Sequence, residues 1–184
     1  MIIPSKEQRS HWATEGYVVF PGLIDNVRLD ALIGAIDQML EPGRAGTLAR
    51  SIRWLDDEKR VPEFISDLLS ADKYAPAFGD FLDTLALPIV ETLIQAPVRC
   101  TWLLLLTGGA GQAYQLPLHR DNSAVNTPEE TDLLERYRDK NFYFQAALVP
   151  DSSFRLVPGS HLRVANEVEI AATKLGGHAI DVPA

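Results

Sequence analysis

The ten-residue segment 98–107 (VRCTWLLLLT) is rich in apolar residues at both of its alternating sets of positions. Successive side chains of a β-strand point to opposite faces of a sheet, so this pattern predicts a strand that is buried on both faces. Pro97 precedes the segment, and a glycine-rich turn follows it. We therefore expect an interior strand here, with Trp102 in the core.

Helical signals dominate the residues before this strand. Ser5 and Gln8 predict a capping box for a short helix that ends at Gly16. Asp25 predicts the cap of a second helix, which carries apolar residues at helical spacing on one face. The Pro-Gly pair at 42–43 is expected to end that helix.

Two further patterns complete this first part. Tyr17 to Phe20 is a short β-prone run, stopped by a Pro-Gly pair. Helical spacing returns at Phe64 and continues to Ile94, with Pro88 expected to kink or break it.

After residue 107, extended segments alternate with short helices. Thr127 predicts a helix cap to which Glu130 returns, and the run 129–140 is typical of a solvated helix face. Strands are expected at 114–121, 142–149, 154–157 and 178–182, and helices at about 127–141 and 165–175.

Helices first and strands later indicate an α+β fold with an antiparallel sheet. A chain of 184 residues is the size of one domain, 1–184, with a mainly helical part at 1–96 and a strand-rich part at 97–184.

Charge and hydropathy exclude several classes of partner. The formal net charge of −8 disfavours nucleic-acid binding, which needs clustered basic residues. The sequence has neither a run of 18 apolar residues nor the apolar core of a signal peptide, so we expect no membrane partner and a cytoplasmic location.

His119 and Asp121 are the first candidate metal ligands. They stand two apart in an expected strand, so their side chains share a face, together with that of Gln115. A histidine and a carboxylate so placed can bind one metal, and a second histidine would complete the facial triad of non-haem Fe(II) oxygenases. The pair is also compatible with an exposed histidine beside a turn aspartate.

The second candidate is the segment FRLVPGSHLR, residues 154–163. Pro158 and Gly159 predict a tight turn directly after a strand, which would hold His161 at a rigid strand exit. His161 could be a metal ligand, a substrate contact or a hydrogen-bonded structural residue.

The chain resembles the phytanoyl-CoA dioxygenase family in the order of its motifs. These are HWATEGYVVFPGLID near the start, then HRD, then a strand followed by VPGSH. The resemblance spans nearly the whole sequence. It implies a double-stranded β-helix core (jelly roll, cupin-like) with the N-terminal helices packed on it. It also implies Fe(II) as the metal, 2-oxoglutarate as cosubstrate and O₂ as oxidant. His119 and Asp121 match the first two iron ligands of the family, and Gln115, on their face, could contact 2-oxoglutarate. In the family the segment after these ligands can fold over the site, so a lid is the alternative role of the run 129–140.

The chain departs from the family pattern at its end. The family's distal iron-binding histidine, and the arginine that pairs with 2-oxoglutarate, would follow Ala184. His178 is the remaining late histidine and is expected to be a strand residue rather than a replacement ligand. The C-terminal strands of the jelly roll are therefore expected to be missing, and we expect a fragment of a longer chain. Open sheet edges could also pair with another copy, which leaves a homo-oligomer open.

These patterns support three alternative functions. The first is an Fe(II)- and 2-oxoglutarate-dependent dioxygenase that hydroxylates, or otherwise oxidises an unactivated C–H bond of, a small organic, secondary-metabolite-like substrate. The second is a non-catalytic jelly-roll binding module without a complete metal triad. The third is a cupin-type metal site built from His119, Asp121 and His161, without 2-oxoglutarate.

Overall fold

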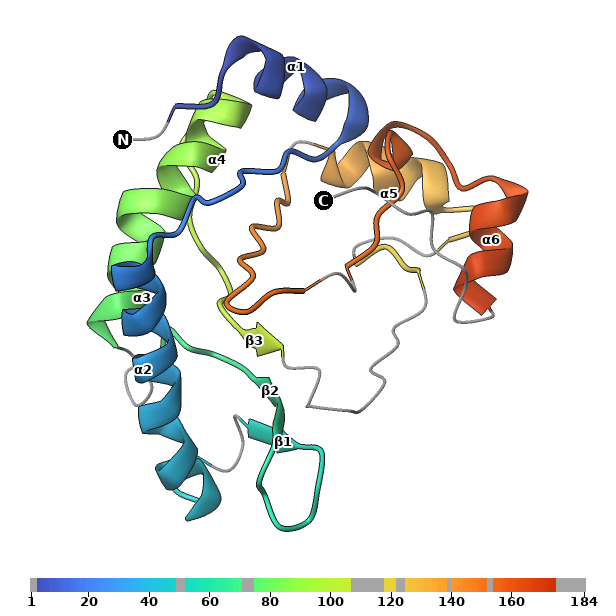
Figure 1. The fold of residues 1–184 in the computed structure, drawn as a ribbon. Coiled ribbons are helices and arrows are strands. Elements are labelled where there is room, and N and C mark those ends of the chain that lie inside the picture. Colours follow the sequence, from blue (N-terminus) through green and yellow to red (C-terminus); the bar gives the residue numbers. More distant parts are fainter. Residues whose placement is uncertain are drawn as a thin grey trace. The chain divides into compact units, whose positions relative to one another are not determined.

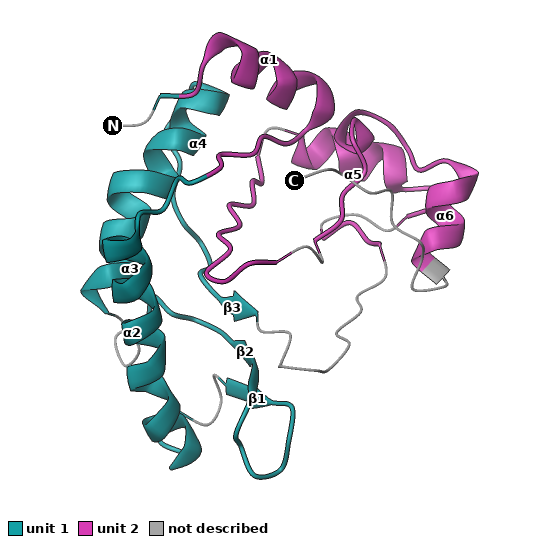
Figure 2. Cartoon of the chain, viewed as in Figure 1, with its two compact units in different colours: residues 1–3, 22–114 teal, residues 4–21, 115–184 magenta. Residues whose placement is uncertain are grey.

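The structure is a computed structural model that describes residues 3–48, 52–70, 75–106, 118–121, 125–138, 140–151 and 154–174 (Figure 1). The chain forms two compact units (Figure 2). Unit 1 comprises residues 1–3 and 22–114, and unit 2 comprises residues 4–21 and 115–184. The first helix therefore belongs to the same unit as the C-terminal half of the chain.

Helix α2 (Asn26–Arg44) is the longest element of unit 1. The Asp25 carboxylate caps it by accepting a 2.8 Å hydrogen bond from the N–H of Arg28, as the sequence predicts. The helix runs slightly past the expected stop at 42–43, because a proline so near the C-terminus removes one helical hydrogen bond while the next turn still closes. Its buried face comprises Leu32, Ala35, Met39 and Gly43.

A second helical stretch packs with α2 in unit 1. It comprises α3 (Pro76–Phe81), a π-helical turn η1 (Leu82–Ala86) and α4 (Leu87–Ile94). Pro88 lies at the start of α4, and the carbonyl that its ring would crowd, that of Thr84 four residues earlier, falls in the π segment. The predicted irregularity at Pro88 is thus a π-helical turn, and the helix does not break there.

A three-stranded antiparallel sheet completes unit 1, in the order β1 (Ile52–Trp54), β2 (Pro62–Ile65), β3 (Leu105–Leu106). Ile65 pairs with both outer strands, opposite Ile52 and Leu105, and is fully buried. The prediction of a helix that starts at Phe64 is therefore wrong for the residues of β2. Their backbone N–H and C=O groups form hydrogen bonds with the neighbouring strands instead.

The expected interior strand 98–107 is shorter and less buried than predicted. Within its described residues only Leu105 and Leu106 pair in the sheet, although Leu103 extends the contact by accepting a 3.0 Å hydrogen bond from the N–H of Leu68. Trp102 is 55% exposed and rests against Phe64. β3 is an edge strand among the described residues, so its outer side has no strand partner there to cover it.

Unit 2 contains α1 (Lys6–Glu15), α5 (Glu130–Tyr137), the 3₁₀ turn η2 (Ser160–Leu162) and α6 (Glu167–Lys174). The capping box of Ser5 and Gln8 and the left-handed Gly16 at the end of α1 are as predicted. Helix α5 is shorter than expected at both ends.

Several strands expected in unit 2 are absent from the described residues. The segments 17–20, 118–121, 142–149 and 154–157 form no ladder, so the strand predictions there are wrong for this structure. The double-stranded β-helix remains a prediction. In the described part of the chain, no helix combines the length and apolar character needed to cross a membrane.

Candidate functional site

The side chains of His119 and Asp121 lie against each other in unit 2. The Nε2 atom of His119 is 3.1 Å from Oδ1 of Asp121, within hydrogen-bonding distance. Both side chains are about half exposed, at 52% and 47%. The sequence prediction that these two groups project to one side is confirmed, although the backbone that carries them is a turn region and not a strand.

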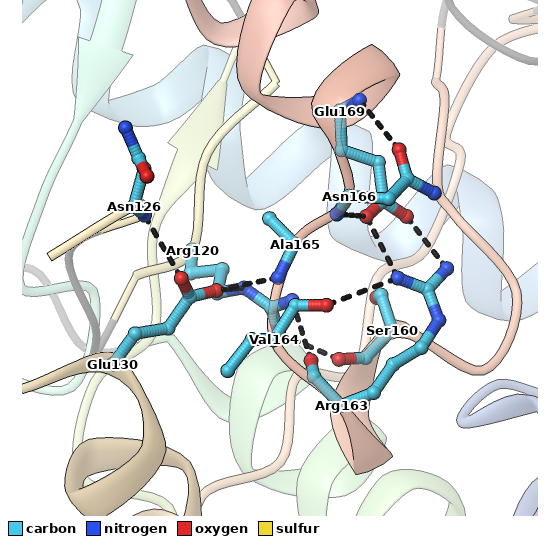
Figure 3. A network of polar contacts seen from close by, with 9 residues as sticks. All are labelled: Arg120, Asn126, Glu130, Ser160, Arg163, Val164, Ala165, Asn166 and Glu169. Carbon is cyan, nitrogen blue, oxygen red and sulfur yellow. Dashed lines mark hydrogen bonds and ion pairs between the residues drawn. The ribbon is translucent and has the colours of Figure 1, made fainter. Parts of the chain in front are cut away.

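Arg120, between these two residues, is held by residues 160–163, which comprise the end of VPGSH and the two residues after it (Figure 3). Its Nη1 donates to the carbonyl of Ser160 at 2.7 Å, and its Nη2 donates to the carbonyl of Arg163 at 3.0 Å. Its Nε is 3.4 Å from a carboxylate oxygen of Glu130. The planar guanidinium thus binds three acceptors at once, which a lysine could not reproduce.

Glu130 is the buried acid of this arrangement. It accepts 2.8 Å hydrogen bonds from the N–H groups of Asn126 and Ala165, one on each carboxylate oxygen, as Figure 3 shows. The predicted cap at Thr127 is wrong, because the helix begins at Glu130 and its N-cap residue is Glu129. Burial lowers the pKa of Arg120, and the neighbouring Glu130 opposes that effect.

A second ion pair stands beside the first. Arg163 donates two hydrogen bonds to Glu169, at 2.7 and 2.8 Å, in the bidentate geometry that fits a guanidinium to a carboxylate. Glu169 also accepts from the N–H of Asn166, whose side chain accepts from the N–H of Glu169. This reciprocal pair is a capping box for α6. The hydrogen bonds from Arg163 lower the pKa of Glu169.

His161 belongs to a contact with the end of α1. The N–H of Gly159 donates to the carbonyl of Glu15 at 2.8 Å, and the His161 ring lies against Gly16. Its Nε2 is 3.4 Å from the carbonyl oxygen of Ala13. Of the three roles open to His161, the structure supports that of a structural residue at a turn.

Within the described part of the chain, the structure brings two of the predicted metal ligands together, His119 and Asp121, but not a third. Among the described residues, no three His, Cys, Asp or Glu side chains are arranged to hold a metal ion. The cupin-type triad of His119, Asp121 and His161 is therefore not formed. Gln115 and His178 lie outside the described residues.

Sequence reasoning did not single out Arg120, and it assigned Glu130 to a helix cap and not to a buried ion pair. Arg120 lies between the two candidate ligands in the sequence, but no local pattern indicates its distant carbonyl partners. Glu130 lies in a run of charges that is typical of a solvated face, yet it is only 3% exposed. Its buried position depends on Ala165, 35 residues away.

We compared the chain with known families, curated proteins and solved structures. No family model matches the chain, and searches of curated proteins and of solved structures find no match either.

Proposed function

We propose that this chain belongs to an Fe(II)- and 2-oxoglutarate-dependent oxygenase that oxidises an unactivated C–H bond of a small organic molecule. His119 and Asp121 are the two iron ligands that it supplies. The 3.1 Å separation between the imidazole nitrogen and the carboxylate oxygen carries the proposal.

The donor set fits a ferrous ion. Imidazole and carboxylate are two of the three ligands of the facial triad. Two atoms that bind adjacent positions on one metal, each at about 2 Å, lie roughly 3 Å apart. The separation of His119 Nε2 and Asp121 Oδ1 agrees with that spacing. The same separation suits a hydrogen bond, in which the imidazole N–H donates to the carboxylate, and a metal would replace that proton.

The chemistry of the bound iron would be activation of O₂ with 2-oxoglutarate as the source of electrons. The protein's contribution is to hold an imidazole and a carboxylate on one side of the chain in fixed register. Both groups are partly exposed, so a small ligand and its cosubstrate can reach them. Arg120 reaches away from this pair to bind Ser160 and Arg163, and it therefore takes no part in ligation.

The decisive measurement is anaerobic Fe(II) binding to the chain, with Co(II) absorption as a second probe. We expect His119→Ala and Asp121→Ala each to weaken binding strongly, because each removes a donor. His11→Ala is the matched control, since His11 of α1 packs edge-on against the ring of Tyr17, outside the proposed ligand pair. Oxygen-dependent conversion of 2-oxoglutarate to succinate by the complete polypeptide, lost in both ligand variants, would give the activity.

Failure of the wild-type chain to bind Fe(II) would reject the oxygenase. If His119→Ala then left binding of a natural ligand intact, a non-catalytic binding module would be the better description.

A further inference from the structure

We infer that Arg120 is a positioning residue that fixes the His119–Asp121 pair, an inference that rests on the proposed role of that pair as iron ligands. The pair itself is half exposed, and its two side chains contact each other. Arg120 lies between them in the chain and is tied to main-chain atoms some 40 residues away. Arg120 therefore connects the exposed pair to a distant part of unit 2.

The contacts of Arg120 define its position from three sides. Two guanidinium nitrogens donate to the carbonyls of Ser160 and Arg163, at the start of the 3₁₀ turn η2 and directly after its end. The third nitrogen faces Glu130, whose carboxylate is itself fixed by two main-chain N–H groups (Figure 3). A side chain so constrained restricts the Cα of its own residue, and with it the direction of the side chains at 119 and 121.

Burial makes this arrangement costly to disturb. The Arg120 and Glu130 side chains are 15% and 4% exposed. Loss of either partner would leave a charge and two main-chain groups without the bonds that compensate for burial. Groups that orient ligands in this indirect way change metal affinity when they are substituted.

Arg163 provides a matched control. It is also an arginine that pairs with a glutamate in unit 2, but its guanidinium binds Glu169 at the start of α6. Arg163→Lys keeps the main-chain carbonyl that Arg120 uses and weakens the second ion pair, together with the hydrogen bond from Arg163 to the carbonyl of Val164. A purely structural role for Arg120 predicts that Arg120→Lys and Arg163→Lys have the same effect on His119.

The readout is the ¹⁵N NMR signal of the His119 imidazole at one fixed pH, without any metal. His119→Ala assigns the signal, and Asp121→Ala defines its position when the carboxylate contact is lost. We expect Arg120→Lys to move the signal toward the Asp121→Ala position and Arg163→Lys to leave it at the wild-type position. Thermal unfolding of each variant checks that it is folded at the temperature of the NMR measurement.

Three results would overturn the inference: an unchanged signal in Arg120→Lys, equal movement in both lysine variants, or a wild-type signal that already matches Asp121→Ala. If Arg120→Lys does not fold, Glu130→Gln takes its place. Asn126 and Ala165 donate to different carboxylate oxygens of Glu130, and glutamine replaces one of these oxygens with an NH₂ group that cannot accept. The criteria are then unchanged.

Co(II) binding separates this inference from the proposed function. We expect Arg120→Lys to weaken Co(II) binding about 10–100-fold and Arg163→Lys to leave it unchanged. A wild-type chain that binds no Co(II) or Fe(II) contradicts the oxygenase proposal, and the NMR comparison still decides whether Arg120 positions the pair.

Discussion

The imidazole ring of His161 occupies the space that a side chain at position 16 would need. A Cβ atom on Gly16 would overlap the ring, with Nδ1 as its nearest atom. Gly16 also has a φ of +83°, in the left-handed region that glycine enters without steric cost. The end of α1 and the turn at 158–161 are therefore matched by shape, in addition to the hydrogen bond from Gly159 to Glu15.

Gly16→Ala should destabilise the protein by about 2–4 kcal/mol, the sum of left-handed strain and overlap with a packed ring. Urea unfolding monitored by circular dichroism measures the effect. Gly22→Ala is the control, because Gly22 has a φ of +66° and a Cβ added there would meet no atom of the described residues within 4 Å. Gly22→Ala should therefore lower the free energy of unfolding by only about 1 kcal/mol, from left-handed backbone strain alone. Equal losses for the two variants would contradict the packing of His161 on Gly16.

Glu130→Ala should lower the free energy of unfolding by about 3–5 kcal/mol, as expected when one partner of a buried ion pair is removed. The change leaves Arg120 without its carboxylate and two main-chain N–H groups without an acceptor. Glu129→Ala, at the exposed neighbouring position, should change stability by less than about 0.5 kcal/mol. A loss in Glu130→Ala no larger than in Glu129→Ala would show that Glu130 is solvated.

The Arg163–Glu169 pair should make stability depend on pH in the acid range. The pKa of Glu169 in the folded protein lies below its ordinary value of 4.5, because Arg163 and the N–H of Asn166 stabilise the carboxylate. The contribution of the Glu169 carboxylate to the free energy of unfolding is therefore complete above about pH 4.5 and is lost as the pH falls through the lowered pKa. The difference in melting temperature between wild type and Glu169→Gln should shrink below pH 4.5. A difference that stays constant down to pH 3 would contradict this.

The sequence predicts best those features that depend on a few neighbouring residues. The cap at Asp25, the capping box of Ser5 and Gln8, and the left-handed end of α1 at Gly16 all have partners within four residues, so their residue types suffice to find them. The side-by-side placement of His119 and Asp121 is local in the same sense.

Features that depend on distant partners are missed or predicted wrongly from the sequence. Ile65 lies in a spacing that suits a helix, but it pairs with Ile52 on one side and with Leu105 on the other. Glu130 has the local signature of a cap, yet the N–H of Ala165 competes for its carboxylate. A short apolar or acidic pattern cannot encode which remote backbone group will reach it.

The contact between Ala13 and His161 spans 148 residues of sequence. A ribosome releases the chain from its N-terminus, so α1 emerges long before the residues that cover its end. The helix can form early, because its capping box is local. It can pack against the turn at 158–161 only after nearly the whole described chain has left the exit tunnel. The order of synthesis thus sets a lower bound on when unit 2 can close.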